Sequence, residues 1–342
     1  MIERIIAFCL QQRLMVIAMT ISIAVSGIIA FEHLPVQAFP DVQNVFVQVV
    51  TQYPGQAPEE VEKQISLPIE RVMNGLPHLM NMRSVSIFGL SVITLTFDDS
   101  AEDYFSRQQV LERLQNAEIP QDLRPQLGPL STGVGEILRY SIDAKHLPLV
   151  EQRALQDWVI EPRIRAVQGV ADVISYGGGV KEYKVSAKPD RLKNYRVSLN
   201  QVFDAIATNN TNAGGGYIEH GDEALVVRGL GLLKNADEIG EIVVTSHDGV
   251  PVRIKDVATI SVGPQPRTGI VGMNQRDDVV EGIVLLIKGR DAVNVLAGVK
   301  EKIEELNNFG LPPGVRITSF YDRTELVGHT IHTVEHNMIE GA

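Results

Sequence analysis

The chain has 342 residues, of which 44% are hydrophobic and 21% are charged, so its composition excludes an intrinsically disordered protein. The formal net charge of −11 argues against a nucleic-acid-binding protein, because such proteins need a basic surface to neutralise phosphates. Cys9 is the one cysteine of the sequence, so neither an intrachain disulfide nor a paired-cysteine metal site can form.

The first predicted element is a helix over Leu14 to Phe31. These 18 residues carry no charge, and a helix of that length spans about 27 Å, close to the ~30 Å hydrocarbon core of a bilayer. We therefore predict a transmembrane helix within an N-terminal segment, residues 1–34, rather than the buried helix of a soluble domain. Arg4 and Arg13 lie on its N-terminal side, which places the N-terminus in the cytoplasm and the rest of the chain across the membrane.

A first α/β unit is predicted after Pro40. Its element order is β-α-β-β-α-β, which is typical of the ferredoxin-like fold. The predicted elements are a strand over 45–51, a helix from Pro58, strands over 82–88 and 90–97, a helix from Ser100 as its N-cap to about residue 115, and a short strand over 125–128.

Three local patterns refine this first unit. Pro68 predicts a kink in the first helix. Ser100 and Asp103 have the spacing of a capping box for the second helix. In the strand 90–97, Thr94 and Thr96 alternate with apolar residues, so one face of the strand is polar and the other apolar.

A second unit of the same kind is predicted, but it is interrupted. Its first half begins at Glu136 and its second half at about Val279, with an α+β insertion over 181–262 between them. Glycines 177–179 and the pair Gly263-Pro264 bracket the insertion. The predicted elements are strands over 136–143, 171–176, 279–288 and 315–321 and helices over 149–166 and 292–308. Within the insertion we expect a strand over 182–187, a helix after Ser198, and a protruding glycine-rich loop over 209–217.

Two acids of the second unit are candidate cation ligands. Glu136 begins one predicted strand, on the face of Leu138 and Tyr140, and Asp172 begins another, on the face of Ile174. The ferredoxin-like order puts one strand between them, so the acids are expected ~10 Å apart at one end of the sheet. One metal ion cannot contact both across that distance. They are either two stations on a cation path, two parts of sites completed by other residues, or simply acids at exposed strand ends.

A third candidate is the series His329, His332 and His336. Spacings of three and four residues place the three imidazoles on one helical face, which suits zinc, copper or nickel. The alternative is a polar helix face near a membrane surface. The sequence lacks the motifs of hydrolases, metalloproteases and kinases, and Cys9 suits packing better than nucleophilic attack. We therefore predict neither an enzyme nor a bound cofactor.

Several motifs together resemble one transporter family. The charge-free stretch from Leu14 to Phe31 is followed by LPVQAFPDVQNVFVQVVTQYPGQAPEEVE, STGVGEI, LQDWVIEPRIRAVQGVADV, YGGGVKEYKV, VPVRIKDVATI and LPPGVRITSFYDRTELV. This combination, which covers essentially the whole chain, is similar to the resistance-nodulation-division (RND) transporters, and within them to the heavy-metal efflux branch of the cobalt–zinc–cadmium and copper–silver type.

The resemblance implies a layout and a set of partners. It assigns 38–130 and 134–178 with 265–325 to porter subdomains and 181–262 to a docking subdomain. The glycine-rich loop near Gly214, Gly215 and Gly216 would reach a neighbouring protomer of a homotrimer. The pump would lie in the bacterial inner membrane, with most of this chain in the periplasm, and would work with a periplasmic adaptor and an outer-membrane channel, driven by proton influx.

The resemblance also bears on the cargo. Glu136 and Asp172 match acidic positions of the divalent-metal members, so zinc, cobalt, cadmium or nickel is expected rather than copper or silver. The chain stops at Ala342, where the second membrane helix of the family should begin, so 326–342 would lead into it and the chain would be an N-terminal fragment. The alternatives are a fragment of a multidrug-type RND pump and a membrane-anchored periplasmic interaction module.

Overall fold

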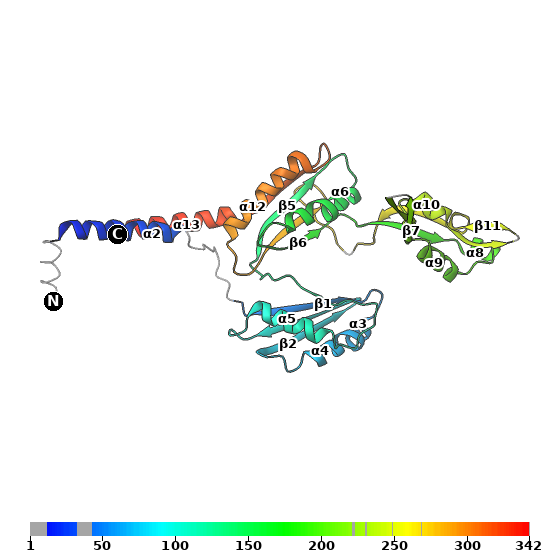
Figure 1. The fold of residues 1–342 in the computed structure, drawn as a ribbon, viewed down its shortest axis with the longest axis horizontal. Coiled ribbons are helices and arrows are strands. Elements are labelled where there is room, and N and C mark those ends of the chain that lie inside the picture. Colours follow the sequence, from blue (N-terminus) through cyan, green and yellow to red (C-terminus); the bar gives the residue numbers. More distant parts are fainter. Residues whose placement is uncertain are drawn as a thin grey trace.

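A computed structural model describes residues 12–32, 43–220, 223–229, 231–247, 249–267 and 269–341. Cys9, Arg4 and the predicted boundary between residues 34 and 38 lie outside these ranges. Figure 1 shows an elongated molecule, with helices α2 and α13 at one end and the inserted segment at the other.

The helix predicted over 14–31 is present as α2, Arg13–Glu32. Eight of its large apolar side chains are at least 49% exposed: Leu14, Met15, Ile17, Met19, Ile21, Ile23, Val25 and Ile29. A search of the described residues finds no helix that is both long and apolar enough to cross a bilayer. The helix is therefore confirmed, and its transmembrane character stays a prediction.

The first α/β unit is built on a four-stranded sheet with the order β2-β3-β1-β4. This order is that of the ferredoxin-like fold, as predicted. The strands are β1 (Phe46–Gln52), β2 (Leu79–Ile87), β3 (Leu90–Phe97) and β4 (Gln126–Leu127), and the helices are α3 (Pro58–Val61), α4 (Leu67–Met73) and α5 (Asp103–Leu114). The apolar face predicted for the strand 90–97 is buried against the helices, with Ile93, Leu95 and Phe97 at most 1% exposed.

Two details of this unit differ from the expected ones. A π-helical turn, Glu62–Ser66, precedes Pro68 and joins α3 to α4. The lengthened turn accommodates a proline that cannot donate to the preceding helix. The predicted capping box is wrong: the N-cap of α5 is Glu102, without a side-chain cap. Instead, the Ser100 hydroxyl donates to Asp98, which also lies 3.1 Å from His78.

The second α/β unit has a sheet with the order β14-β5-β13-β6, again the ferredoxin-like order. Its middle strand β13 is completely buried. The strands are β5 (Glu136–Asp143), β6 (Val170–Tyr176), β13 (Glu281–Leu286) and β14 (Arg316–Asp322); the helices are α6 (Leu149–Leu155), α7 (Glu161–Arg165) and α12 (Ala292–Glu305), with π-helical turns Gln156–Ile160 and Leu306–Gly310. The turn 156–160 precedes Pro162 as the turn 62–66 precedes Pro68, so the two units share this device.

The inserted segment leaves and re-enters the second unit through two paired strands. β7 (Lys181–Ala187) and β12 (Ala258–Pro264) are antiparallel partners along their whole length. The other elements are α8 (Pro189–Asn194), α9 (Leu199–Thr208), β8 (Ala213–His220), β9 (Glu223–Gly229), α10 (Ala236–Glu241), β10 (Val243–His247), β11 (Val250–Arg253) and α11 (Ile254–Val257). The helix predicted after Ser198 is confirmed, with Ser198 and Gln201 forming its capping box.

The glycine-rich stretch of the insertion is not the loop that was predicted. Gly214, Gly215 and Gly216 lie within β8, which pairs with β9 as an antiparallel hairpin. The register shifts between Gly214 and Tyr217, so the glycines form an irregular part of the strand. Glycine within a strand often marks a bulge or other irregularity, which fits this shift of register.

The last helix, α13 (Arg323–Gly341), follows β14 directly. Asp322 links the two, because its Oδ1 accepts a hydrogen bond from the Thr324 backbone N–H at 2.8 Å while Oδ2 pairs with Lys300 of α12. Burial acts to raise the pKa of Asp322, but the hydrogen bonds from Lys300 and Thr324 outweigh it, so that this pKa lies below 3.8.

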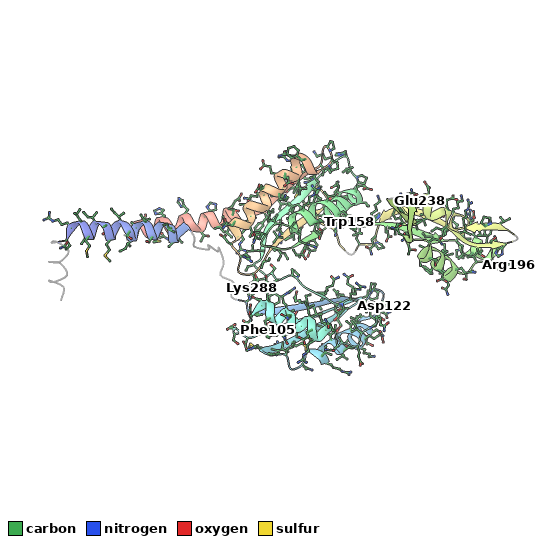
Figure 2. The ribbon with its side chains drawn as sticks, in the orientation of Figure 1. Phe105, Asp122, Trp158, Arg196, Glu238 and Lys288 are labelled. Carbon is green, nitrogen blue, oxygen red and sulfur yellow. The ribbon has the colours of Figure 1, made fainter. Side chains whose placement is uncertain are left out.

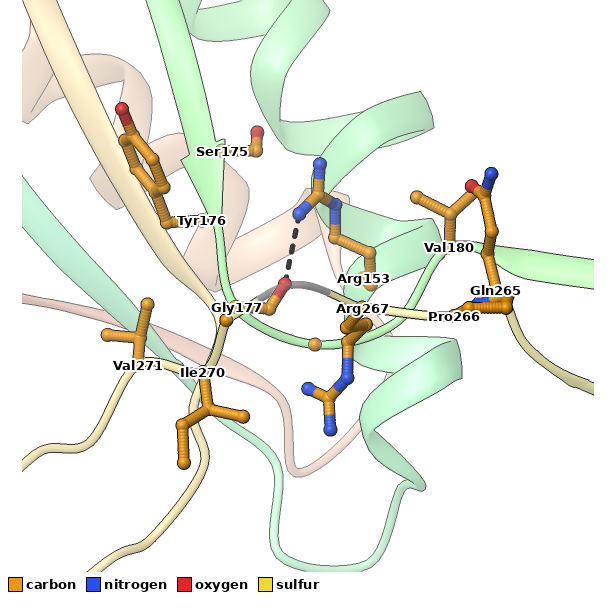
Figure 3. Close-up of a pocket in the computed structure, with 12 residues that line it drawn as sticks. Arg153, Ser175, Tyr176, Gly177, Val180, Gln265, Pro266, Arg267, Ile270 and Val271 are labelled. Atoms are coloured by element: carbon orange, nitrogen blue, oxygen red, sulfur yellow. Dashed lines mark hydrogen bonds between the residues drawn. The ribbon is translucent and has the colours of Figure 1, made fainter. Parts of the chain in front are cut away.

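Figure 3 shows the joint between the second unit and the insertion. Arg153 of α6 donates to the carbonyl oxygen of Gly177 at 2.9 Å and to Asp157 at 2.8 Å, which ties the chain after β6 to the helix layer. Gly177 has φ +69°, and a Cβ there would overlap the carbonyl oxygen of Val279. At the other side of the joint, a Cβ added at Gly263 would have no atom within 4 Å.

These surroundings predict opposite outcomes for two alanine substitutions. Gly177→Ala should destabilise the protein by about 2–4 kcal/mol, because it adds left-handed backbone strain to a steric clash. Gly263→Ala should change stability little. Thermal unfolding of the two purified variants checks this, and equal unfolding temperatures would contradict the described joint.

The lowered pKa of Asp322 predicts a pH dependence. An acid whose pKa is lower in the folded state stabilises the fold above its unfolded pKa, and this contribution is lost as pH falls through the folded pKa. Wild type should therefore be more stable than Asp322→Asn at about pH 7, and the difference should shrink below about pH 4. Chemical denaturation at several pH values measures it. Asp204→Asn, at an exposed position of α9, serves as the control.

Candidate functional site

Glu136 lies on the open face of the second sheet, opposite the face covered by helices. Leu285 of β13 pairs with Glu136, whereas the preceding residue Val284 pairs with Leu138, so β5 carries one extra residue at Ile137. This β-bulge reverses the alternation of faces. The prediction that Glu136 shares a face with Leu138 and Tyr140 is therefore wrong, because those two side chains are buried in the core.

Asp172 lies in the same row as Glu136. Leu285 pairs with Glu136 on one side and with Asp172 on the other, so the three residues stand side by side across β5, β13 and β6. Two strand spacings separate the acids by ~10 Å. The predicted placement of the two acids is thus confirmed, including the strand between them. Their role in a cation path stays a prediction.

Each acid lines its own cavity, and each cavity also has walls from the first unit. The cavity at Glu136 has a volume of about 780 Å³ and is lined across from it by Gln48, Thr94 and Thr96. Thr94 and Thr96 belong to the polar face predicted for strand 90–97, and Gln48 of β1 pairs with Thr94. Carboxylate, amide and hydroxyl oxygens thus face one another there.

The cavity at Asp172 is smaller, about 370 Å³. Tyr104 and Arg107 of α5 line it from the first unit, and Arg165 lines it from the second. Near this boundary the units are held together by Lys288, which lies 3.4 Å from Asp103 (Figure 2). Both candidate acids therefore lie where the two α/β units face each other.

Glu136 forms an ion pair with Arg139 on the same strand. Nε and Nη2 of Arg139 donate to Glu136 Oε2 at 3.1 and 2.5 Å, and these hydrogen bonds raise the pKa of the Arg139 guanidinium. Arg139 Nη1 also lies 3.6 Å from Oε1 of Glu281 on β13. Burial raises the pKa of Glu281, and the positive charge of Arg139 acts in the opposite direction.

Asp172 has a similar partner in Arg165, at the end of α7. Nη2 of Arg165 lies 2.7 Å from Asp172 Oδ1 and 2.5 Å from Glu161 Oε1. Glu161 in turn accepts a hydrogen bond from Ser175 at 3.1 Å. Asp172 Oδ1 also accepts from the backbone N–H of Val173, which fixes the carboxylate at the strand edge.

A buried polar network continues from Ser175 into the core. Gln156 donates to the hydroxyls of Ser175 and Tyr140 at 3.0 and 2.9 Å. Tyr140 and Gln156 are fully buried, and burial raises the pKa of the Tyr140 hydroxyl. Because the network satisfies these polar groups, it holds β5, β6 and α7 in a fixed arrangement around the acids.

The three histidines of α13 do not gather with other ligands. His332 and His336 are in edge-to-face contact with ring centroids 6.4 Å apart, and His336 lies 3.5 Å from Glu340. In the described part of the chain, no group of three or more His, Cys, Asp or Glu residues is placed to hold a metal ion. The alternative of a polar helix face therefore fits His329, His332 and His336 better.

Sequence reasoning missed Glu281 and the two arginines. Glu281 stands alone as a charge in the apolar run VVEGIVLLI, which forms the buried middle strand. A lone acid in such a run is the signal that could have revealed it, because burying a carboxylate costs free energy unless a cation is near. Arg139 and Arg165 carry no comparable signal, since their partners are set by the sheet register.

A sequence profile described as the AcrB/AcrD/AcrF family matches residues 5–342. The chain belongs to this family. Its members are transporters, so the prediction that the chain is not an enzyme is confirmed. The resemblance to the heavy-metal efflux branch is confirmed as well by individual relatives and solved structures.

Among curated relatives, Protein HelA of Legionella pneumophila is 42% identical over 351 residues, which cover 100% of this chain and 33% of HelA. The cobalt-zinc-cadmium resistance protein CzcA of Cupriavidus metallidurans is 40% identical, with 100% and 33% covered. The cation efflux system protein CusA of Escherichia coli K12 is 37% identical, with 99% and 33% covered.

A crystal structure of a heavy metal efflux pump, in its second crystal form, matches with a TM-score of 0.92 and 41% identity. The match covers 98% of this chain and 34% of that pump. The AcrB/AcrD/AcrF-family chain described here thus spans about a third of the length of the relatives that it matches.

Proposed function

We propose that this chain is the N-terminal part of an RND pump that exports divalent heavy-metal cations, driven by proton influx. The observation that carries the proposal is the row of Glu136, Leu285 and Asp172, which presents two carboxylates to cavities between the porter units. The relatives named for cobalt, zinc, cadmium and cation efflux support it.

The chemistry of the cavity at Glu136 favours zinc, cobalt, cadmium or nickel as cargo. Carboxylate, amide and hydroxyl oxygens suit hard and borderline divalent cations, whereas Cu(I) and Ag(I) prefer sulfur ligands. Since the two acids lie ~10 Å apart, they serve as successive stations on a path rather than as ligands of one ion. Residues from the remainder of the complete protein would complete each station.

Helix α2 is proposed as an anchor in the bacterial inner membrane, with most of the chain in the periplasm. Two observations support this location. The sequence from Leu14 to Phe31 carries no charge, and the large apolar side chains of the described part of α2 are exposed on the protein surface. Burying them in lipid would remove this apolar area from water.

The proposed assembly is a homotrimer that works with a periplasmic adaptor and an outer-membrane channel. The hairpin of β8 and β9, which contains Gly214, Gly215 and Gly216, would reach the neighbouring protomer. Trp158 (Figure 2) and Phe309 lie in π-helical turns of the second unit and are 82% and 90% exposed, which leaves aromatic surface for contacts with another chain. The net charge of −11 is not suited to nucleic acid as a partner.

Neutralising the two acids should weaken export. In the complete protein, Glu136→Gln and Asp172→Asn are each expected to lower the zinc concentration that cells tolerate and to raise their zinc content, because each removes one carboxylate of the path. Growth in zinc and metal content per cell are the measurements, with the amount of membrane-inserted protein determined in parallel.

Asp143→Asn is the matched control. Asp143 lies on the same strand as Glu136 but at its other end, is exposed to a similar degree, and is also paired with an arginine, Arg276, at 3.2 Å. It should leave zinc tolerance unchanged. Full tolerance in both path variants, at normal protein levels, would overturn the proposed function.

The membrane orientation has its own test. In a Cys9→Ser background, Lys193→Cys gives residues 1–342 a single thiol, at an exposed position in α8. Any cysteine in the rest of the complete protein is replaced by serine as well. A thiol reagent that cannot cross membranes should label this cysteine in spheroplasts without lysis, because the position is proposed to be periplasmic. Labelling that required lysis would place the inserted segment in the cytosol and contradict the anchor orientation.

A further inference from the structure

Both candidate acids of the cation path are held by an arginine that also contacts a second acid. Glu136, Arg139 and Glu281 form one such group, and Asp172, Arg165 and Glu161 form the other. Here they are named the Arg139 group and the Arg165 group. Each contains two carboxylates and one guanidinium and therefore carries a net charge of −1 when all are ionised.

In both groups the second acid is less exposed than the path acid. The side chain of Glu281 is 10% exposed against 40% for Glu136, and that of Glu161 is 19% exposed against 30% for Asp172. The attraction between opposite charges grows as water is excluded. The inner acid therefore offers the guanidinium a partner in a less aqueous setting than the path acid does.

A divalent cation and the arginine compete for the same carboxylate oxygens. Arg139 donates twice to Oε2 of Glu136, and Arg165 contacts Oδ1 of Asp172. A cation with charge +2 that reaches either acid repels the guanidinium and replaces it. Partly exposed ion pairs of this kind are weak, so the exchange is within reach of an incoming ion.

We propose that Arg139 and Arg165 are resident counter-cations of the path, and that Glu281 and Glu161 receive them when a divalent cation displaces them. The proposal rests on the proposed function of Glu136 and Asp172. It makes the arginines and the inner acids positioning residues, which set the affinity of each station without binding the cargo.

The geometry requires only small movements. Arg139 Nη1 already lies 3.6 Å from Glu281 Oε1, so a change of side-chain torsions brings it into direct contact. Arg165 contacts both of its acids in the present structure, so it need only give up one of them. The displaced positive charge stays paired in both groups, which avoids leaving a guanidinium or an inner carboxylate unpaired.

Such an exchange suits a transport path. A station has to bind an ion firmly enough to take it up and weakly enough to release it. The returning arginine supplies a positive charge at the station as the ion leaves, so the emptied carboxylate is paired again at once.

Zinc uptake by proteoliposomes that contain the complete transporter tests the exchange, with the apparent KM and the maximal rate measured separately. Glu281→Gln removes the receiver, so Arg139 stays on Glu136 and the apparent KM for Zn²⁺ should rise roughly threefold, with the maximal rate nearly unchanged. The double variant Arg139→Gln/Glu281→Gln removes the competitor as well, and its apparent KM should fall below that of wild type.

Glu161→Gln and Arg165→Gln/Glu161→Gln repeat the comparison in the Arg165 group, in case a Glu281 variant fails to fold. Asp143→Asn, at the far end of β5, and Arg276→Gln, which removes the ion-pair partner of Asp143, should leave the apparent KM unchanged. The opposite signs expected for single and double variants distinguish counter-cation exchange from a purely structural role, which would impair both.

Single and double variants that raise the apparent KM alike, or that leave it unchanged, would overturn the exchange while Glu136→Gln still impairs uptake. If Glu136→Gln and Asp172→Asn themselves leave uptake unchanged, the proposed function fails, whatever the arginine variants do.

Discussion

The arrangement of the second unit depends on β13, which pairs with β5 on one side and with β6 on the other. Through it Leu285 becomes the neighbour of both Glu136 and Asp172, although these residues come from three distant parts of the sequence. The register is specified because a shift of one residue would exchange the two faces of β13 and put a residue with a side chain where Gly282 packs against the Tyr140 ring. The position of the two carboxylates is therefore fixed by hydrophobic packing rather than by their own contacts.

The two units share one fold but carry different side chains on their uncovered faces. Both have a ferredoxin-like sheet covered by helices on one face, and both use a π-helical turn before a proline, at Pro68 and Pro162. The uncovered face of the first sheet supplies hydroxyl and amide groups, including Thr94 and Thr96, while that of the second supplies charges. Two similar units facing each other in this way form cavities whose walls differ in chemistry, which neither unit alone could provide.

Much of this could be predicted from sequence, and the failures have identifiable causes. Periodicity and turn residues predicted both strand orders, the interruption of the second unit and the placement of Glu136 and Asp172 on either side of one strand, because these follow from local patterns and one topological rule. The face of Glu136 could not be predicted, since the bulge at Ile137 is visible only in the pairing with β13. The glycines near Gly215 resemble a loop in composition, yet a partner strand places them in a hairpin. The partners of Arg139 and Arg165 depend on the same long-range register.

The pairing of β7 with β12 has a consequence for how the chain folds. Seven residue pairs join the two strands, so the points where the insertion departs and returns lie next to each other. The loop of about 82 residues is then closed by its own strands, and the entropy of bringing β6 and β13 together is that of a short connection rather than a long one. The insertion can acquire its own core, around Val202, Ile254 and Val257, before the second sheet is complete. A middle strand supplied so late in the sequence thus need not make assembly slow.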